Sequence, residues 1–277
     1  AFWDGQQMTF GDGASTFYPL VSLDVMAHEV SHGFTEQNSG LVYSNKSGGL
    51  NEAFSDILGV SAEFFHAAKG SGLPYPVNYQ LGETISPGYP SRDLADPASV
   101  FSYNRNGVKA FSKPNHYASR WLPTDDESPQ DNGWVHINSS IVNHAFYLAV
   151  EGGGTSSRSK KTVNGVGANN RADIEQAFYQ AFTYHLTPTA QMRDARYWTI
   201  EKAPTPAARA AISDAWDAVG LHGDQDVKVL LAVWPGHSYC GSSKLTVTVL
   251  VANTGARTFN VSSLDFRQIT PANELVG

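Results

Sequence analysis

Apolar side chains recur three and four positions apart in two stretches near the start of the chain, which is the spacing of amphipathic helices. The first helix is predicted to begin after Ser22, whose hydroxyl can cap it, and to fade near Gly40. The second is predicted over residues 50–68, with Lys69-Gly70 closing it. These two helices carry most of the candidate chemistry described below.

Four more helical patterns lie in the second half of the chain. Two are predicted over residues 138–150 and 171–186. The other two are expected near 188–202 and 206–219, because Thr187-Pro188 and Thr205-Pro206 each place a capping hydroxyl before a proline at the first helical position.

The alternation of apolar and polar residues that is typical of strands is found near the two ends of the chain. Residues 1–20 are expected to form strands and turns, and residues 70–135, rich in Pro, Gly, Ser and Asn, only short elements. From about Asp224 the alternation of Val and Leu predicts a small β module, complete or incomplete. The fold class is therefore expected to be α+β, with a part over 1–222 that is mainly helical after residue 136 and an all-β module over 223–277.

Composition narrows the classes of function. The 277 residues are 41% apolar with a net charge of −7, which argues against disorder and against a broad nucleic-acid-binding surface. The single cysteine, Cys240, excludes an intrachain disulfide, and the sequence has no apolar run long enough to span a membrane. Asp125-Asp126-Glu127 is interpreted as a solvated loop. Trp234 and Tyr239 of the β module could serve adhesion to a substrate or carbohydrate, or belong to a sandwich core.

The first helix contains the pattern His-Glu-x-x-His at residues 28–32. Residues four apart on a helix are separated by about 40° around the axis and roughly 6 Å along it, so His28 and His32 can reach one metal ion. Glu29 points about 100° away, close enough to act on water at the metal without binding the metal itself. The alternative, two surface histidines on an amphipathic helix, stays open on this pattern alone.

A catalytic zinc needs three protein ligands and one open position. The second helix offers Glu52, Asp56 and Glu63, whose offsets place them in one carboxylate stripe along the helix. Because the rest of that helix is apolar, the stripe either faces solvent or serves cations.

The segment Ala27–Gly33 (AHEVSHG), followed by Ser47–Asp56 (SGGLNEAFSD), closely resembles the thermolysin-like zinc metalloproteases, the family of thermolysin, pseudolysin and vibriolysin. The resemblance extends from Ala1 to about Leu221. It implies a zinc ion on His28, His32 and Glu52, with Glu29 as general base. It also implies that Asp56 accepts the second ring N–H of His28 and so fixes its orientation.

The resemblance assigns four further residues around the reacting carbonyl group. His136, in the segment DNGWVHIN, matches the second active-site histidine of the family, and Asp131 matches the carboxylate that orients it. Tyr43 matches the tyrosine that donates to the same oxygen, and Arg92 matches the arginine that binds a substrate carbonyl. The spacing of these residues alone does not select them.

Calcium is a second expected ion. Carboxylates that converge from two helices and a loop suit calcium, and by resemblance Asp24, Glu63 and Glu83 fit a structural calcium site. Asn78 and Gln80 stand where a double site needs acidic residues, so one calcium ion is expected rather than two.

The start of the chain matches the edge strand that pairs with the substrate backbone in the family, which implies substrate-binding roles for Ala1 and Trp3. The β-rich lobe that precedes this strand in the family is expected to be missing, and that lobe or a propeptide is an expected partner segment. The family also implies a secreted protein, although the chain shows no signal peptide.

The expected function is that of a zinc endopeptidase, and the resemblance implies that it cuts proteins before bulky apolar residues. Leu20, Leu23 and Val25 near the first helix suggest an apolar pocket. Two alternatives remain. One is a metal-binding but inactive fragment that acts as a binding or structural protein. The other is a zinc aminopeptidase, although the sequence shows no segment that could anchor a free amino terminus.

Overall fold

A computed structural model describes residues 1–70, 72–73, 75–86, 89–103, 109–122, 131–154, 161–222, 227–233, 248–253, 268–269 and 275–276. The chain divides into two compact units, Ala1–His222 and Gly223–Gly277. Within the described residues, no helix combines the length and the apolar character needed to cross a membrane.

The two predicted N-terminal helices are present. Helix α1 spans Leu23–Gln37, and it begins where the sequence predicts, although the Ser22 side chain makes no capping hydrogen bond. Helix α2 spans Asn45–Ala68 and begins five residues before the predicted start. The added turn contains Gly48, where a side chain would lie 2.5 Å from Val135 and 3.0 Å from the backbone of Tyr43. Gly48 is therefore a site of close helix packing.

The remaining helices are α3 (Val135–Glu151), α4 (Arg171–Tyr184), α5 (Met192–Glu201) and α6 (Pro206–Ala218). The prediction for α6 is confirmed, including its cap, because Oγ1 of Thr205 accepts from the backbone N–H of Ala208. The prediction that Thr187-Pro188 opens a helix is wrong. Helix α5 begins at Met192, because Gln191 and Asp194 form a reciprocal capping box there.

Short antiparallel strand pairs connect the helices. In the first unit β1 (Phe2–Trp3) pairs with β2 (Met8–Thr9), β3 (Gln80–Leu81) with β4 (Arg92–Asp93), and β5 (Phe101–Tyr103) with β6 (Lys109–Ser112). Short 3₁₀ turns at Pro97–Ser99, Tyr117–Ser119 and Ala168–Asn170 complete the unit. The expected α+β class with a mainly helical lobe is thus confirmed.

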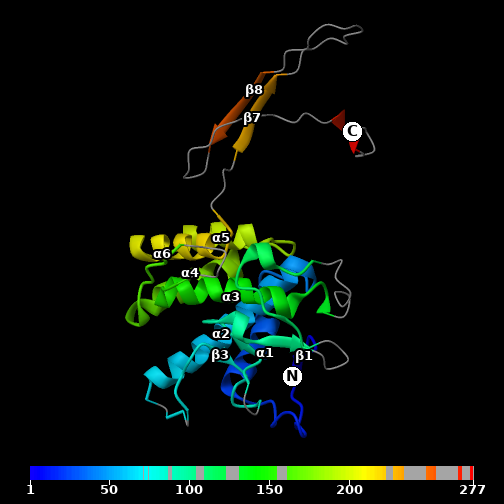
Figure 1. The fold of residues 1–277 in the computed structure, drawn as a ribbon, viewed down its shortest axis with the longest axis vertical. Coiled ribbons are helices and arrows are strands. Elements are labelled where there is room, and N and C mark those ends of the chain that lie inside the picture. The colour runs from blue at the N-terminus through cyan, green and yellow to red at the C-terminus, as the bar shows by residue number, and fades with distance from the viewer. Residues whose placement is uncertain are drawn as a thin grey trace. The chain divides into compact units, whose positions relative to one another are not determined.

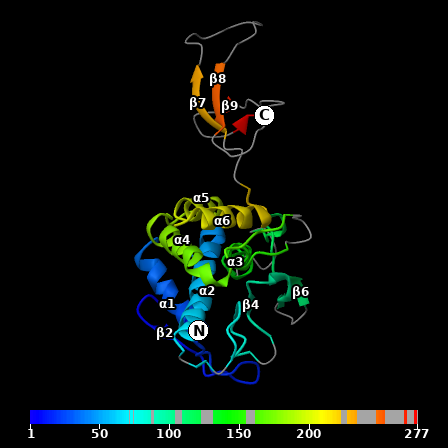
Figure 2. The same ribbon diagram turned by 90° about the vertical axis from the view of Figure 1, so that its left-hand side faces the viewer.

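Helix α2 lies between α1 and α3, and α3 packs on its other side against α6 (Figures 1 and 2). The core around these helices contains stacked aromatic rings, with Phe54 and Phe182 4.9 Å apart and Phe178 and Trp216 6.2 Å apart between centroids. All four side chains are buried. This packing holds α1 and α2 side by side, and the candidate site lies on these two helices.

In the second unit, β7 (Val227–Val233) pairs with β8 (Thr248–Asn253), and β9 (Gln268–Ile269) with β10 (Leu275–Val276), both antiparallel. The β character predicted for this unit is present in these strands. Trp234, Tyr239, Cys240 and the acidic run at residues 125–127 lie outside the described residues.

Candidate metal centre and active site

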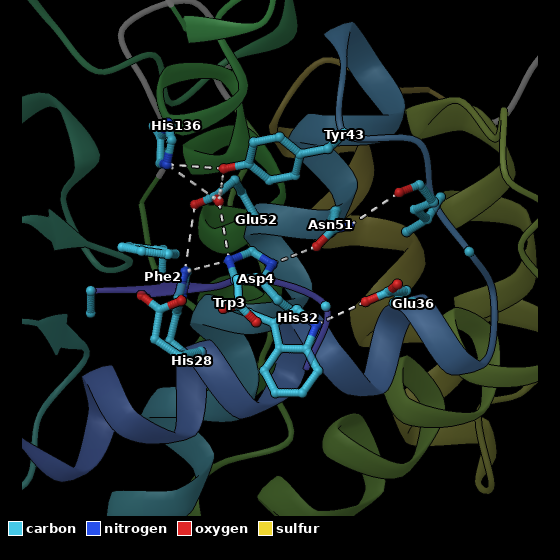
Figure 3. Close-up of a pocket in the computed structure, with 15 residues that line it drawn as sticks. Phe2, Trp3, Asp4, His28, His32, Glu36, Tyr43, Asn51, Glu52 and His136 are labelled. Carbon is cyan, nitrogen blue, oxygen red and sulfur yellow. Dashed lines mark hydrogen bonds and ion pairs between the residues drawn. The ribbon is translucent and has the colours of Figure 1, made fainter. Parts of the chain in front are cut away.

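Two helices bring the three predicted metal ligands together (Figure 3). His28 and His32 lie one turn apart on α1, and their Nε2 atoms are 3.0 Å apart. Glu52 lies on α2, with Oε2 3.7 Å from Nε2 of His28 and Oε1 3.3 Å from Nε2 of His32. Of the described residues, this trio alone brings three such atoms within 4.8 Å of one another.

The donor set fits a tetrahedral zinc ion. Zinc–ligand bonds of about 2.1 Å at tetrahedral angles place ligand atoms about 3.4 Å apart. The two histidine Nε2 atoms are 3.0 Å apart, close to that value, and a different oxygen of Glu52 faces each of them, at 3.7 Å from His28 and 3.3 Å from His32. Glu52 is 0% exposed, and its Oε2 atom has no hydrogen-bond partner among the described residues. A buried carboxylate oxygen is costly without cationic partners, and a metal ion would supply one in addition to Arg92, whose Nη2 lies 3.6 Å from this atom.

Both histidine rings are oriented through their second nitrogen atom. Nδ1 of His28 lies 2.8 Å from Oδ1 of Asp56, and Nδ1 of His32 lies 2.7 Å from Oδ1 of Asn51. Both partners come from α2, so one helix orients the two ligands of the other. No role is predicted for Asn51 from the sequence. Its position next to Glu52 is the signal that could have identified it, because a histidine that binds a metal needs a partner for its second ring nitrogen.

The carboxylate stripe of α2 does not face solvent. Glu52, Asp56 and Glu63 are 0%, 0% and 1% exposed, so the solvent-facing alternative is wrong. Arg92 neutralises part of the negative charge of these carboxylates, because its Nε lies 2.7 Å from Oδ2 of Asp56 and its Nη2 lies 3.6 Å from Oε2 of Glu52. Burial alone would raise the pKa of Glu52, but His136 and the other cationic partners hold it well below its usual range.

His136 is held between two partners at the edge of the metal centre. Its Nδ1 lies 2.5 Å from Oδ1 of Asp131, and its Nε2 lies 3.1 Å from the hydroxyl of Tyr43. The Tyr43 hydroxyl also donates to Oε1 of Glu52. Burial and the nearby Glu52 raise the pKa of Tyr43 above its usual range, so its phenol keeps its proton as a hydrogen-bond donor.

A tight turn places His136 in this position. Asn132, Gly133 and Trp134 have consecutive positive φ angles of 47°, 86° and 68°. A bulky residue such as Trp134 rarely adopts this left-handed conformation, and strain of this kind is concentrated at functional sites. The Trp134 ring is buried and its Nε1 donates to the carbonyl of Leu122, which holds the turn.

A cavity of about 560 Å³ opens in front of the metal centre. Glu29, His136 and Tyr43 line it together with Ala1 and Trp3 of the first strand. A smaller cavity of about 230 Å³ shares Ala1, Glu29 and Arg92 with the site, and its apolar lining consists of Phe17, Leu20, Val25, Leu81 and Ile85. Leu20 and Val25 therefore line an apolar pocket as expected, whereas Leu23 does not.

The first strand is fixed on α1 by Trp3 (Figure 3). Nε1 of Trp3 donates to Oε2 of Glu36 at 2.8 Å. Its ring covers Gly33, where an added Cβ would lie 2.9 Å from Cε2 of Trp3. The glycine that follows His32 is thus the place where the strand approaches the metal helix most closely.

The three expected calcium ligands are neighbours, but they do not form a convergent ligand set. Asp24 accepts from the backbone N–H groups of Val25 and Gly82 at 2.8 and 2.5 Å. Burial raises the pKa of Glu63 to about 7, with Asp24 and Glu83 adding to the shift. Oε2 of Glu63 is buried with no partner in the part of the chain that is described. Calcium at this place stays a prediction.

The chain matches the sequence models of two domains. Residues 39–221 match the thermolysin metallopeptidase α-helical domain, and residues 1–36 match the thermolysin metallopeptidase catalytic domain. A thermostable neutral protease of Geobacillus stearothermophilus is 36% identical over 233 residues, which are 80% of this chain and 37% of that protein. A neutral protease of Vibrio proteolyticus is 48% identical over 149 residues, covering 53% of this chain and 20% of that protein.

A solved structure of a metalloproteinase also resembles this chain. The precursor of protealysin, a metalloproteinase from Serratia proteamaculans, matches with a TM-score of 0.60 and 26% identity, over 79% of this chain and 64% of that one. The chain spans less than two fifths of the length of the neutral protease from Geobacillus. The helical-domain match extends over more than half of the chain and includes Glu52 and His136, while His28 and His32 lie in the catalytic-domain match. The chain therefore belongs to the thermolysin metallopeptidase family.

Proposed function

We propose that the chain forms the active site of a zinc-dependent endopeptidase. The single observation that carries the proposal is the convergence of His28, His32 and Glu52 on the wall of an open cavity, with one ligand atom from each within 4.8 Å of the others. When bound there, zinc would supply Lewis-acid chemistry and make water acidic enough to be deprotonated near neutral pH.

The residues around the metal centre can supply the remaining steps. Glu29 lines the cavity beside both histidines and can take a proton from water and pass it to the leaving amine. His136 and Tyr43 can donate to the oxygen that becomes negative during attack on the carbonyl. Asp131 keeps the ring of His136 in place for that donation.

The substrate would lie along the first strand. The backbone of β1, with Ala1 and Trp3 at the cavity, can add a substrate strand to its edge. Arg92 faces the smaller cavity and can bind a substrate carbonyl with the guanidinium N–H groups that Asp56 leaves available. The apolar lining of that cavity favours a bulky apolar side chain next to the cut bond.

Two further parts of the proposal concern structure and location. One calcium ion near Glu63 would neutralise the buried carboxylates of Asp24, Glu63 and Glu83. Burial, and to a smaller extent the charges of Asp24 and Glu83, raise the pKa of Glu63. Action outside the cell agrees with the name of another relative, a virulence metalloprotease of Vibrio anguillarum that is 46% identical over 149 residues.

The test uses the zinc-loaded chain and a peptide blocked at both ends. The proposal predicts one zinc ion per chain by elemental analysis and cleavage inside the peptide. Glu29→Gln should keep the zinc and lose about 10²- to 10⁴-fold in kcat, while Glu201→Gln, an exposed change on α5, should leave both unchanged. Zinc binding without Glu29-dependent cleavage would instead indicate an inactive metal-binding protein, and cleavage only of peptides with a free amino terminus would indicate an aminopeptidase.

A further inference from the structure

One buried lysine contacts the backbone of His136 without being part of the predicted machinery. Lys113 follows strand β6 and is only 6% exposed. Its ammonium group donates to the backbone carbonyl of His136 at 3.4 Å. The ion pairs within 4.0 Å that the structure gives for the described residues do not include Lys113, so its charge is not neutralised by direct contact.

The surroundings of Lys113 are made of the charged residues of the active site. Burial and, next in size, the positive charge of Arg92 lower the pKa of Lys113 to about 7. Three carboxylates act in the opposite direction, Glu52 and Asp56 on α2 and Asp131 before α3. A solvated lysine would cost far less free energy, so burial at this place calls for a compensating role.

We propose that Lys113 is a positioning residue for His136. Its ammonium group holds the carbonyl of His136 from inside the protein, while Asp131 holds the imidazole ring from the other end of the same residue. The two contacts fix both the backbone and the side chain of the group proposed to donate to the reacting oxygen. The inference rests on the proposed function, because it concerns the efficiency of that reaction.

The positive charge of Lys113 near the site depends on pH. Below about pH 7 Lys113 carries a proton, and above it the ammonium becomes a neutral amine, which makes a weaker hydrogen bond to a carbonyl. Its hold on His136 should therefore weaken as pH rises. Glu52, Asp56, Arg92, Asp131 and His136 face the same region, so the effect of Lys113 must be separated from theirs by substitution.

The experiment compares Lys113→Met, Lys113→Arg and the control Lys69→Met, an exposed lysine at the end of α2. Zinc content, melting temperature and the pH profiles of kcat and KM on a blocked peptide are measured for each. Lys113→Met should lower kcat about tenfold, the effect of losing one charged hydrogen bond, with KM and zinc content unchanged. The wild type should show a fall in kcat near pH 7 that Lys113→Met lacks, and Lys113→Arg should keep its rate to higher pH because a guanidinium stays protonated.

Several results would overturn the inference. One is a Lys113→Met variant with the kcat and pH profile of the wild type. Another is a variant that loses fold or zinc together with activity, since that outcome would mark the lysine as structural. A side-chain NMR titration of Lys113 with a midpoint near its free value of about 10.4 would contradict the buried charge whatever the activity. A zinc-loaded wild type that cleaves nothing would instead contradict the proposed function.

Discussion

Oδ1 of Asp56 lies 2.8 Å from Nδ1 of His28, although the two residues come from different helices. The contact links α2 to the proposed zinc ligand on α1, and the other carboxylate oxygen of Asp56 lies 2.7 Å from Arg92. One buried carboxylate therefore contacts both the proposed zinc ligand His28 and Arg92, the arginine proposed to bind substrate.

Asp56→Asn should weaken zinc binding by about 10- to 100-fold, the usual effect of removing the partner that orients a metal-binding histidine. The amide is similar in size, but it neither accepts from His28 with a full charge nor pairs with Arg92. Zinc affinity is measured by competition with a chromophoric chelator. The exposed change Asp12→Asn should leave the affinity unchanged, and an equal affinity in both variants would show that Asp56 does not act through His28.

Gly33→Ala should raise KM without lowering the melting temperature. Alanine favours a helix interior over glycine by about 1 kcal/mol, so the melting temperature should not fall. The new Cβ would lie 2.9 Å from the ring of Trp3 and displace the first strand, so KM should rise several-fold. Gly49→Ala on α2 is the matched control, because its Cβ would have no neighbour closer than 3.8 Å. A variant with unchanged KM would contradict the substrate role proposed for β1.

Tyr43→Phe should lower kcat by about 10²-fold and leave KM nearly unchanged, because the hydroxyl, which donates to Glu52 in the structure, is proposed to donate during the reaction to the oxygen that gains charge. Steady-state kinetics on a blocked peptide give both constants. Tyr197→Phe removes a hydroxyl from an exposed tyrosine of α5 and should have no effect. A rise in KM at constant kcat would assign Tyr43 to substrate binding instead.

The calcium proposal predicts an unusual dependence of stability on pH. Burial raises the pKa of Glu63 from 4.5 to about 7, so the folded protein binds the proton more tightly than the unfolded chain. In calcium-free buffer the protonated Glu63 therefore stabilises the folded state. This stabilisation is fully present below pH 4.5 and is lost as pH rises through 7, which lowers the free energy of unfolding by up to about 3 kcal/mol. Calcium should restore it at pH 8 and have little effect at pH 4.5.

Melting temperatures with calcium or EGTA at the two pH values check this prediction, in the Glu29→Gln background to prevent self-cleavage. Glu63→Gln should remove both the loss at high pH and the gain from calcium. If EGTA leaves the melting temperature of the parent protein unchanged at pH 8, the calcium site is wrong.

The helices that carry the site could be predicted because their signals are local. The spacing of His28 and His32 predicts a pair of metal ligands before any packing is known, while the third ligand, Glu52, is selected by the resemblance of the surrounding segments to the family. Thr205-Pro206 likewise marks the start of α6 by local capping. In these places the sequence pattern and the tertiary structure agree, as expected for minimally frustrated segments.

The features that the sequence did not predict arise from tertiary contacts or from competing local signals. The start of α2 lies five residues before the predicted one, and the added turn contains Gly48, where Val135 and Tyr43 approach too closely for a side chain. Thr187-Pro188 carries the signal for a helix start, but Gln191 and Asp194 supply a stronger one. Lys113 lies in an irregular segment with no periodicity, and only the folded chain brings it next to His136.

The central claim is that His28, His32 and Glu52 bind one zinc ion, and anomalous diffraction tests it most directly. Crystals of zinc-loaded Glu29→Gln protein would be measured above and below the zinc absorption edge. The structure predicts one peak within about 2.1 Å of Nε2 of both histidines and of a carboxylate oxygen of Glu52. The absence of a peak there, or a zinc ion bound at other residues, would contradict the metal centre.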